Sequence, residues 1–238
     1  MRTAYTVFRN LYNVRKMTMK LVLASGSQRR RELLTMCGYD YEIIVSNADE
    51  TIDESDPESF VRALSFRKAK EVFDRLFAAG RRDFAVIGSD TVVAFQKEGE
   101  TKPVIIGKPK DAKDAVRILS MLSGKTHRVF TGVSVIADIP DENAAAQCSI
   151  REKAEIQTEC SITEVTFETL SPNEITDYVN SGDPLDKAGS YGIQGPFGMF
   201  VREIRGNYFT VIGMPIPVLY KMLKKIGILP HGFYECIE

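Results

Sequence analysis

The segment from Leu21 to Leu34 constrains the fold more than any other part of the chain, because a strand, a turn and a helix start follow one another there directly. Leu21 to Ala24 is a short apolar run typical of a buried strand. The small residues Ser25 to Ser27 form the turn, and the helical pattern that follows ends at Gly38. The sequence therefore predicts a strand that leads through a tight turn into a helix.

Three arginines, Arg29 to Arg31, fall in the first turn of that helix. The helix macrodipole is positive there and makes each cation unfavourable by about 0.3–1 kcal/mol, so an anion should compensate. Free helix N–H groups, guanidinium groups and the hydroxyls of Ser25 and Ser27 together predict a phosphate-binding cradle, with a basic surface turn as the alternative. Because successive helical residues point about 100° apart, we expect at most two of these arginines at one site and Arg31 in solvent.

Strands and helices alternate along the rest of the chain without one regular repeat. Pro57 opens a long helix, Phe84 to Phe95 is predicted as a buried strand interrupted at Gly88 to Thr91, and two strands flank Gly206-Asn207 as a hairpin. Because several strands are consecutive, the sequence predicts an α/β fold with a mixed, twisted sheet flanked by helices. The chain has no long Gly/Ser linker, so two lobes that share a cleft fit better than two independent domains.

Composition excludes several classes of protein. The formal net charge of -1 over 238 residues argues against binding to a nucleic-acid backbone, and no apolar run approaches the ~20 residues that cross a bilayer. The four cysteines lack CxxC spacing, which signals neither a zinc site nor a disulfide framework. With only His127 and His231 available, carboxylates and lysines are the expected catalytic groups.

Charged residues at several points along the chain are candidates for chemistry. Lys68 lies on the apolar stripe of its helix, so its side chain either reaches solvent along that surface or serves a site. Asp90 follows a buried apolar run, where α/β proteins place metal-ligating or proton-accepting carboxylates, and a turn or cap residue is the alternative. Glu50 could share a hard cation with Asp90, and Lys108 in its Gly-Lys-Pro turn suits a fixed cation that meets phosphate. Solvated loop charges are the alternative for both.

The segment from Asp183 to Gly195 is rich in glycine and contains Gln194. The amide of this glutamine can both donate and accept hydrogen bonds toward the edge of a base. An ordered loop with an exposed glutamine is the alternative.

The first twenty residues hold five basic and no acidic residues. This composition resembles a mitochondrial targeting segment, and a disordered N-terminal extension over residues 1–20 is the alternative.

Taken together, several segments resemble the Maf family of nucleoside triphosphate pyrophosphatases. In family order they are LASGSQRRRELL, VIGSDTVV, GKP, LSGKTHRVFTGVSV, GDPLDKAGSYGIQG and GNYFTVIGMPI. The resemblance implies one catalytic domain over residues 21–238, whose two lobes enclose a deep nucleotide cleft. It also implies a cytoplasmic location and a homodimer.

The KAGSYGIQG version of the late motif looks like the subgroup of the family that acts on dTTP and UTP. The resemblance implies hydrolysis of these and of modified pyrimidine nucleotides to the monophosphate and pyrophosphate, in a house-cleaning role. A divalent cation, Mg²⁺ or Mn²⁺, would assist. The partners would be the nucleoside triphosphate and a second copy of the chain, with neither nucleic acid nor membrane.

The resemblance also assigns catalytic roles by motif. Asp90 would accept the proton of the attacking water, and Lys68 and Lys108 would neutralise charge on the phosphates. Glu50, together with Asp90, would hold the metal ion.

The substrate-binding roles follow in the same way. Ser25, Arg29 and Arg30 would contact the triphosphate, and Thr91 and Gln194 would lie near the base. One departure is Gln28, which replaces the usual proline before the arginine pair and loosens the helix start.

A nucleotide-binding regulator of cell division without turnover would use the same cleft, but the intact Asp90 and both lysines argue against it. A phosphotransferase would need a P-loop or kinase motif set, which the sequence lacks.

Overall fold

The computed structural model describes residues 19–139 and 154–231. The targeting or extension segment predicted over residues 1–20 lies outside these ranges, except for Met19 and Lys20. Met19 belongs to a hydrophobic core cluster with 8% of its surface exposed, and Lys20 pairs with Phe84 at the start of the first strand. The folded part of the chain therefore includes the two residues before Leu21.

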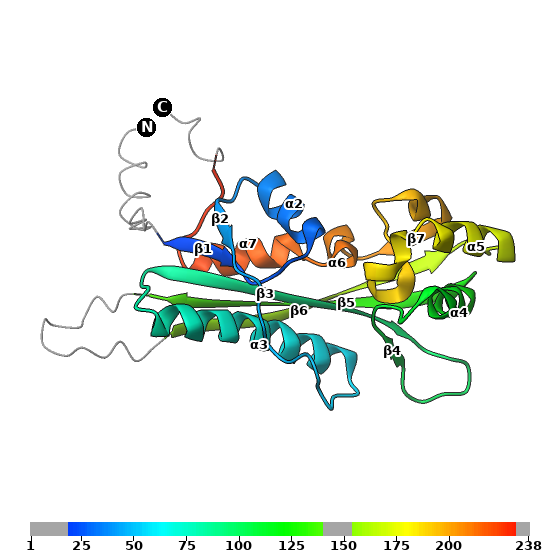
Figure 1. Ribbon diagram of the computed structural model, residues 1–238, viewed down its shortest axis with the longest axis horizontal. Coiled ribbons are helices and arrows are strands. Elements are labelled where there is room, and N and C mark those ends of the chain that lie inside the picture. The colour runs from blue at the N-terminus through cyan, green and yellow to red at the C-terminus, as the bar shows by residue number, and fades with distance from the viewer. Residues whose placement is uncertain (1–18, 140–153, 232–238) are drawn as a thin grey trace, which may run out of the picture.

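A mixed seven-stranded sheet runs through the described part of the molecule (Figure 1). β1 pairs in parallel with β2 and β3, and the other pairings are antiparallel, in the order β2-β1-β3-β5-β6-β7 with β4 paired to β3. The strands are β1 (Lys20–Leu23), β2 (Tyr41–Ile43), β3 (Phe84–Phe95), β4 (Val104–Ile106), β5 (Thr126–Asp138), β6 (Ala154–Phe167) and β7 (Val201–Arg205). The predicted mixed α/β sheet is confirmed.

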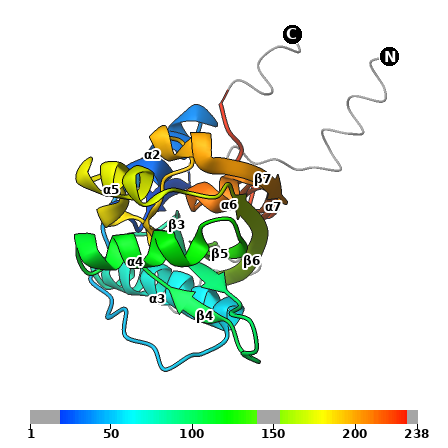
Figure 2. The ribbon, with the colours of Figure 1, turned by 90° about the vertical axis from the view of Figure 1, so that its right-hand side faces the viewer.

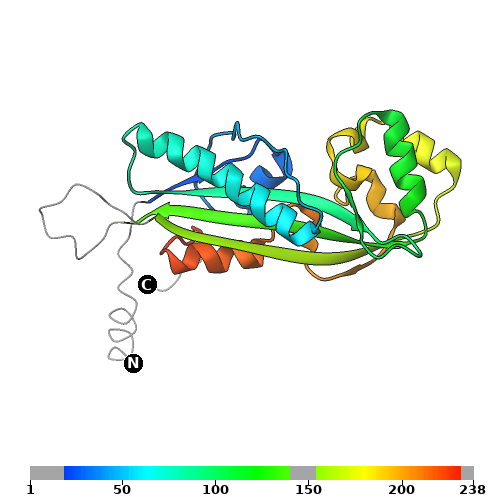
Figure 3. The ribbon, with the colours of Figure 1, turned by 90° about the horizontal axis from the view of Figure 1, so that it is seen from below.

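Helices cover both faces of the sheet at the end that carries β1 (Figure 3). Alternate residues of β3 face two helix layers, because Ile87 packs with α2 and α7 while Val86 packs with α3. The helices are α2 (Gln28–Met36), α3 (Pro57–Ala78), α4 (Ala112–Leu122), α5 (Pro172–Asn180), α6 (Tyr208–Ile212) and α7 (Ile216–Lys225), with short 3₁₀ turns η1 (Asp183–Asp186), η2 (Ala188–Ser190) and η3 (Pro196–Phe200).

The opposite end of the long strands carries a second lobe, in which α4 and α5 lie beside each other (Figure 2). Its hydrophobic core cluster is separate from the clusters under α2, α3 and α7. Aromatic rings hold this lobe together, with Phe167 and Phe197 packed edge to face at 4.8 Å between their centroids. Strands β3 and β5 contribute residues to the cores of both lobes, so the lobes share one sheet.

The predicted interruption of the strand at Gly88 to Thr91 is wrong, because β3 is continuous. Every residue from Ala85 to Ala94 is in register with β5, including the pair of Asp90 with Gly132. Asp90 therefore lies within a strand rather than in a turn or at a helix cap. Glycine in an apolar run suggests a break locally, whereas the long partner strand keeps the backbone paired.

The predicted hairpin at Gly206-Asn207 is also wrong. β7 ends at Arg205, and Asn207 instead caps α6, with its side-chain oxygen accepting a hydrogen bond from the N–H of Phe209 at 2.8 Å. The short segment after Asn207 is helical because Thr210 is anchored to neighbouring strands. Its hydroxyl bonds that of Ser161, and its carbonyl accepts from the hydroxyl of Thr131.

Two glycines allow α3 to lie directly on the sheet. A Cβ atom on Gly88 would stand 2.2 Å from the carbonyl oxygen of Ser65, and one on Gly132 would stand 2.2 Å from that of Val61. Real Cβ atoms do not approach backbone oxygens so closely, so neither position accepts a side chain without a shift of the helix. This close approach brings Lys68, one turn further along α3, to Asp90 on β3.

We expect Gly132→Ala to lower the free energy of unfolding by about 3 kcal/mol, because the backbone of α3 must move to admit the methyl group. Urea denaturation of the variant and of the parent chain would measure this difference. Gly107→Ala is the matched control, since a Cβ there would meet no atom within 4 Å. Equal stability of the Gly132 variant and the parent chain would contradict this close packing of α3 on the sheet.

Candidate active site

A cavity of about 740 Å³ opens between the two lobes. The site residues that the sequence predicts all line it, although they come from six separate segments of the chain. They are Ser25, Arg29, Arg30, Glu50, Lys68, Asp90, Thr91, Lys108 and Gln194. The structure thus gathers these residues at one place, while the individual role of each stays a prediction.

The N-terminus of α2 faces this cavity and leaves backbone donors without helical partners. The first N–H groups of a helix have no intrahelical acceptor, and the side chain of the N-cap residue Ser27 makes no capping hydrogen bond. Ser25 lies in the turn before it, where its hydroxyl accepts from the N–H of Ser27 at 3.2 Å. Unpaired N–H groups and the helix dipole both favour negative charge, so this turn has the local features of the anion cradle that the sequence predicts, while phosphate binding itself stays a prediction.

Arg30 is a fixed cation at the wall of the cavity. Its guanidinium donates to the carbonyl of Gly213 at 2.8 Å, to the hydroxyl of Ser25 at 3.2 Å and to the hydroxyl of Thr91 at 3.3 Å. Burial lowers the pKa of Arg30, and the negative charge of Asp90 opposes that shift. An arginine remains charged under these conditions, so the cavity holds a desolvated positive group in one orientation.

The hydroxyl of Thr91 can be assigned a direction. Thr131 donates its only hydroxyl hydrogen to the carbonyl of Thr210 at 2.7 Å. In its contact with Thr91, at 3.0 Å between the oxygens, Thr131 must therefore accept. Thr91 then presents only lone pairs to the cavity side, where Arg30 already donates to it.

Arg29 and Arg31 differ in position, as the helical spacing predicts. Arg29 lines the cavity and forms an ion pair with Asp186 of η1, with 3.3 Å between Nη1 and Oδ2. Arg31 does not line the cavity, which confirms that at most two of the arginines face it. The expectation that Arg31 is solvated is wrong, because its side chain is half-buried and donates to the carbonyl of Gly26 at 3.4 Å.

Lys68 bridges two carboxylates on the opposite wall. Its ammonium lies 2.8 Å from Oδ1 of Asp90 and 3.0 Å from Oε1 of Glu50. Lys68 and Asp90 are 12% and 11% exposed as side chains, whereas Glu50 is 64% exposed. The alternative in which Lys68 extends into solvent is excluded. The second carboxylate oxygen of Asp90 accepts no hydrogen bond from the described residues and is therefore available to a ligand.

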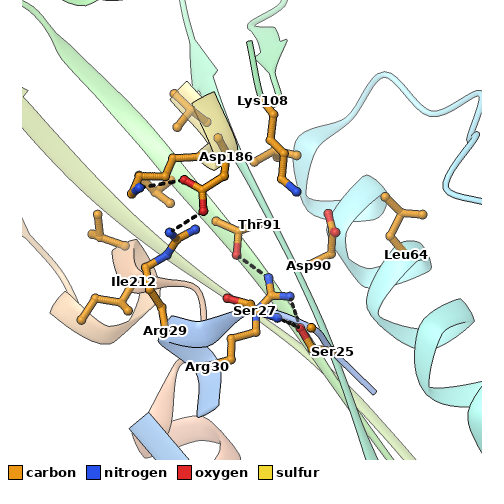
Figure 4. Close-up of a pocket in the computed structure, with 18 of the residues that line it drawn as sticks. Ser25, Ser27, Arg29, Arg30, Leu64, Asp90, Thr91, Lys108, Asp186 and Ile212 are labelled. Atoms are coloured by element: carbon orange, nitrogen blue, oxygen red, sulfur yellow. Dashed lines mark hydrogen bonds and ion pairs between the residues drawn. The ribbon is translucent and has the colours of Figure 1, made fainter. Parts of the chain in front are cut away.

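Lys108 and Gln194 come from the second lobe. Lys108 points into the cavity toward Asp90 (Figure 4), and within the described residues it forms no ion pair. Gln194 follows η2 and is exposed at the cavity wall. The cavity therefore has cationic groups on more than one side, with a carboxylate pair between them.

Neither histidine lies in this cavity. His127 is buried behind it, where Nε2 is 3.0 Å from the hydroxyl of Tyr191 and desolvation lowers its pKa to about 3. His231 pairs with Asp40 at the surface. The cavity lining includes carboxylates and lysines but neither histidine, and the expectation that carboxylates and lysines are the catalytic groups stays a prediction.

Within the described ranges no group of three or more His, Cys, Asp or Glu side chains converges as a metal site. Glu50 and Asp90 form a pair of oxygen donors held by one ammonium. Magnesium is commonly bound through one or two carboxylates with the remaining ligands supplied by phosphates and water. The donor set present therefore fits a hard cation that arrives with a phosphorylated substrate.

The sequence of the chain matches known proteins over most of its length. The family model described as "Maf-like protein" matches residues 20–226. The chain belongs to the Maf family. A protein of Agathobacter rectalis named dTTP/UTP pyrophosphatase is 40% identical over 217 residues, which cover 88% of this chain and 98% of that protein. A protein of the same name from Bacillus thuringiensis subsp. konkukian is 43% identical over 210 residues, covering 88% and 96%.

A solved structure of the Staphylococcus aureus Ham1 protein aligns with this Maf chain at 14% identity and a TM-score of 0.42, covering 87% and 99% of the two chains. None of the helices in the described part of the Maf chain is long and apolar enough to span a membrane.

Sequence reasoning missed two charged residues of the Maf cavity, Asp186 and Lys187, which line it beside Arg29. Both belong to the late glycine-rich motif, in which the sequence predicts a role for Gln194 alone. Apolar residues also line the cavity, among them Phe60 and Leu64 of α3. Their positions on the apolar stripe of the helix are equally typical of a core, so helical periodicity alone does not identify a cavity wall.

Proposed function

We propose that this chain is a nucleoside triphosphate pyrophosphatase that hydrolyses dTTP and UTP, and modified pyrimidine nucleotides, to the monophosphate and pyrophosphate. The observation that carries the proposal is the arrangement of the cavity. An anion cradle with the fixed guanidinium of Arg30 faces the ion-paired carboxylates of Asp90 and Glu50. A cavity built in this way can bind a polyphosphate on one wall and act on it from the other.

In the proposed reaction, the oxygen of a water molecule attacks the α-phosphorus, and the bond from that phosphorus to the oxygen bridging to the β-phosphate breaks. The water proton passes to Asp90, whose second carboxylate oxygen is open to a ligand. Negative charge develops on the departing pyrophosphate, where Lys68, Lys108 and Arg30 supply positive charge. Arg30 acts without reorganisation, because three hydrogen bonds hold its guanidinium in place.

The proposal includes a divalent cation, Mg²⁺ with Mn²⁺ as a substitute. Glu50 and Asp90 would hold it, and it would supply Lewis-acid stabilisation to phosphate oxygens. Lys68, which now bridges these two carboxylates, would be released toward the phosphates. Support comes from the two oxygen donors that meet at one ammonium.

Pyrimidine preference is supported by the relatives, which are named dTTP/UTP pyrophosphatase. Gln194 stands at the cavity wall with an amide that can pair with both the donor and the acceptor of a uracil or thymine edge. Thr91 offers lone pairs and fits a substrate group that donates. A cytoplasmic location and assembly into a homodimer stay predictions from the family resemblance.

A panel of nucleoside triphosphates tests the proposal, with Mg²⁺ present or removed by a chelator and with pyrophosphate and orthophosphate measured separately. We expect dTTP and UTP to be the best substrates, pyrophosphate to be the primary product and the chelator to abolish turnover. Orthophosphate as the primary product would refute the pyrophosphatase activity. Nucleotide binding without any turnover would instead indicate a regulator.

A further inference from the structure

The ion pair between Arg29 and Asp186 joins the two lobes across the cavity. Arg29 belongs to the first turn of α2 in one lobe, and Asp186 ends η1 in the other. Both residues line the cavity, and Figure 4 shows the carboxylate of Asp186 above the guanidinium of Arg29. A carboxylate therefore occupies the position beside Arg29 where an anionic ligand of the cavity would bind.

The two neighbouring arginines of α2 are held in different ways. Arg30 donates to three acceptors on β3, on the turn after β1 and at the end of α6, and all of them are uncharged. Arg29 has one polar side-chain contact with the described residues, the 3.3 Å bond to Asp186, and its side chain is 29% exposed. Arg29 thus keeps most of its donors free and depends on a single exchangeable partner.

Asp186 has a second partner that remains when Arg29 departs. Its Oδ1 lies 2.7 Å from the ammonium of Lys187, while Oδ2 faces Arg29. Lys187 is itself fixed by Asp183, through the side chain at 3.1 Å and the backbone carbonyl at 2.6 Å. Loss of the Arg29 contact therefore leaves Asp186 paired, which keeps the cost of exchange small.

Asp186 is a carboxylate at neutral pH. Partial desolvation opposes its ionisation, but the hydrogen bond and charge of Lys187, together with the charge of Arg29, outweigh this effect and lower the pKa of Asp186. The side chain is 68% exposed, so the ion pair with Arg29 is of the solvent-screened type, worth about 0.2–1 kcal/mol. A triphosphate carries more charge than a carboxylate and presents several oxygens, and both properties favour it over Asp186 as a partner of the guanidinium.

We propose that Asp186 is an internal competitor for Arg29, a positioning residue whose carboxylate holds this guanidinium across the cavity until a polyphosphate displaces it. The proposal rests on the proposed function in that the displacing ligand is the triphosphate of the substrate. Asp186 then raises the substrate concentration needed for half-saturation without entering the chemical step. The phosphate replaces the carboxylate of Asp186 at the guanidinium of Arg29, and Asp186 then stays paired with Lys187.

Titration calorimetry, which measures the binding of inorganic triphosphate to the full chain, tests the proposal without requiring turnover. We expect Asp186→Asn to lower the Kd by about 1.4- to fivefold, the factor that corresponds to an exposed ion pair. In an Arg29→Ala background the same change should leave the Kd unaltered. Asp177→Asn on α5 is the matched control, because Asp177 is exposed and lies outside the cavity lining.

Each alternative outcome contradicts the proposal. Weaker binding by Asp186→Asn would mean that the carboxylate orients Arg29 productively. An equal fall in Kd in the parent and the Arg29→Ala backgrounds, or a fall in Kd for Asp177→Asn, would show that the effect comes only from the loss of one negative charge. If the parent chain did not bind triphosphate, this ligand could not displace Asp186 from Arg29, and the proposal would be refuted.

Steady-state kinetics with dTTP provide a second measurement, in which Asp186→Asn should lower KM by the same factor and leave kcat unchanged. A fall in kcat would contradict a role confined to binding. If the parent chain binds triphosphate but hydrolyses no nucleotide, the proposed function fails while the calorimetric result still decides the role of Asp186.

Discussion

Asp90→Asn should lower kcat for dTTP by about 10²- to 10⁴-fold, the range that a positioned general base contributes. The amide keeps the size of the side chain and can still accept a hydrogen bond from Lys68, which lies 2.8 Å from Oδ1 in the parent chain. What it loses is the ability to accept a proton at the second oxygen. Rapid-quench and steady-state assays of pyrophosphate release measure the change.

Nucleotide binding should survive in this variant, because the anion cradle of α2 and the hydrogen bonds that hold Arg30 do not involve the side chain of Asp90. Calorimetric titration with dTTP in the absence of metal checks this directly. Asp53→Asn is a suitable control, since Asp53 is an exposed residue that does not line the cavity. Turnover near that of the parent chain would remove Asp90 from the role of base.

Lys68→Met should also cost about 10²- to 10³-fold in kcat, as expected when a preorganised charge that stabilises the transition state is removed. Methionine retains the aliphatic stem against the apolar side of α3, so the loss is confined to the ammonium. The matched control is Lys70→Met, because Lys70 lies two residues along the same helix and is 52% exposed in a surface pair with Asp74. That variant should turn over at the parental rate.

The Lys68 variant should in addition be less stable to unfolding by about 1–3 kcal/mol, because Asp90 is left as a nearly buried carboxylate without its cation. Adding Asp90→Asn to Lys68→Met removes the unpaired charge, so we expect the double variant to regain most of this stability while staying inactive. Chemical denaturation separates the two effects. A Lys68 variant that loses neither activity nor stability would show that the bridge between the carboxylates is incidental.

His127 is a buried residue that supports the cavity wall and does not titrate near neutral pH. The pKa of His127 is lowered to about 3 by burial, so this residue is neutral near pH 6 to 7. Its hydrogen bond to Tyr191 holds an aromatic residue that lines the cavity. Any change of activity near pH 6 to 7 therefore has its origin in groups other than His127.

Much of the candidate site could be predicted from sequence because its residues follow local signals. Ser25, Arg29 and Arg30 sit at a strand-to-helix turn, and the crowding of cations at a helix start already implies an anion. Asp90 follows an apolar run, and Lys68 interrupts an apolar helical stripe. Each signal depends only on neighbours within a few residues, which is the range over which the sequence determines structure directly.

What sequence could not supply are the contacts made between distant segments. The pairing of Lys68 with Asp90 depends on α3 lying against β3 and β5, which Gly88 and Gly132 allow by leaving no side chain in the way. The continuity of β3 likewise depends on β5, its partner across the sheet. Local patterns describe neither of these approaches, because they are fixed by packing between elements.

The strand, turn and helix start that precede Gly38 show the same difference between local and tertiary information. The sequence from Leu21 to Leu34 determined that arginines crowd the start of a helix and that an anion should compensate them. Only the tertiary structure decided which partner each of them meets in the folded chain. Arg30 is held by three uncharged oxygens, whereas Arg29 meets Asp186, a residue 157 positions away that the other lobe carries to the cavity. The cations at the helix start make a negative partner favourable, which is a local effect. The sheet shared by the two lobes brings that partner, Asp186, to Arg29.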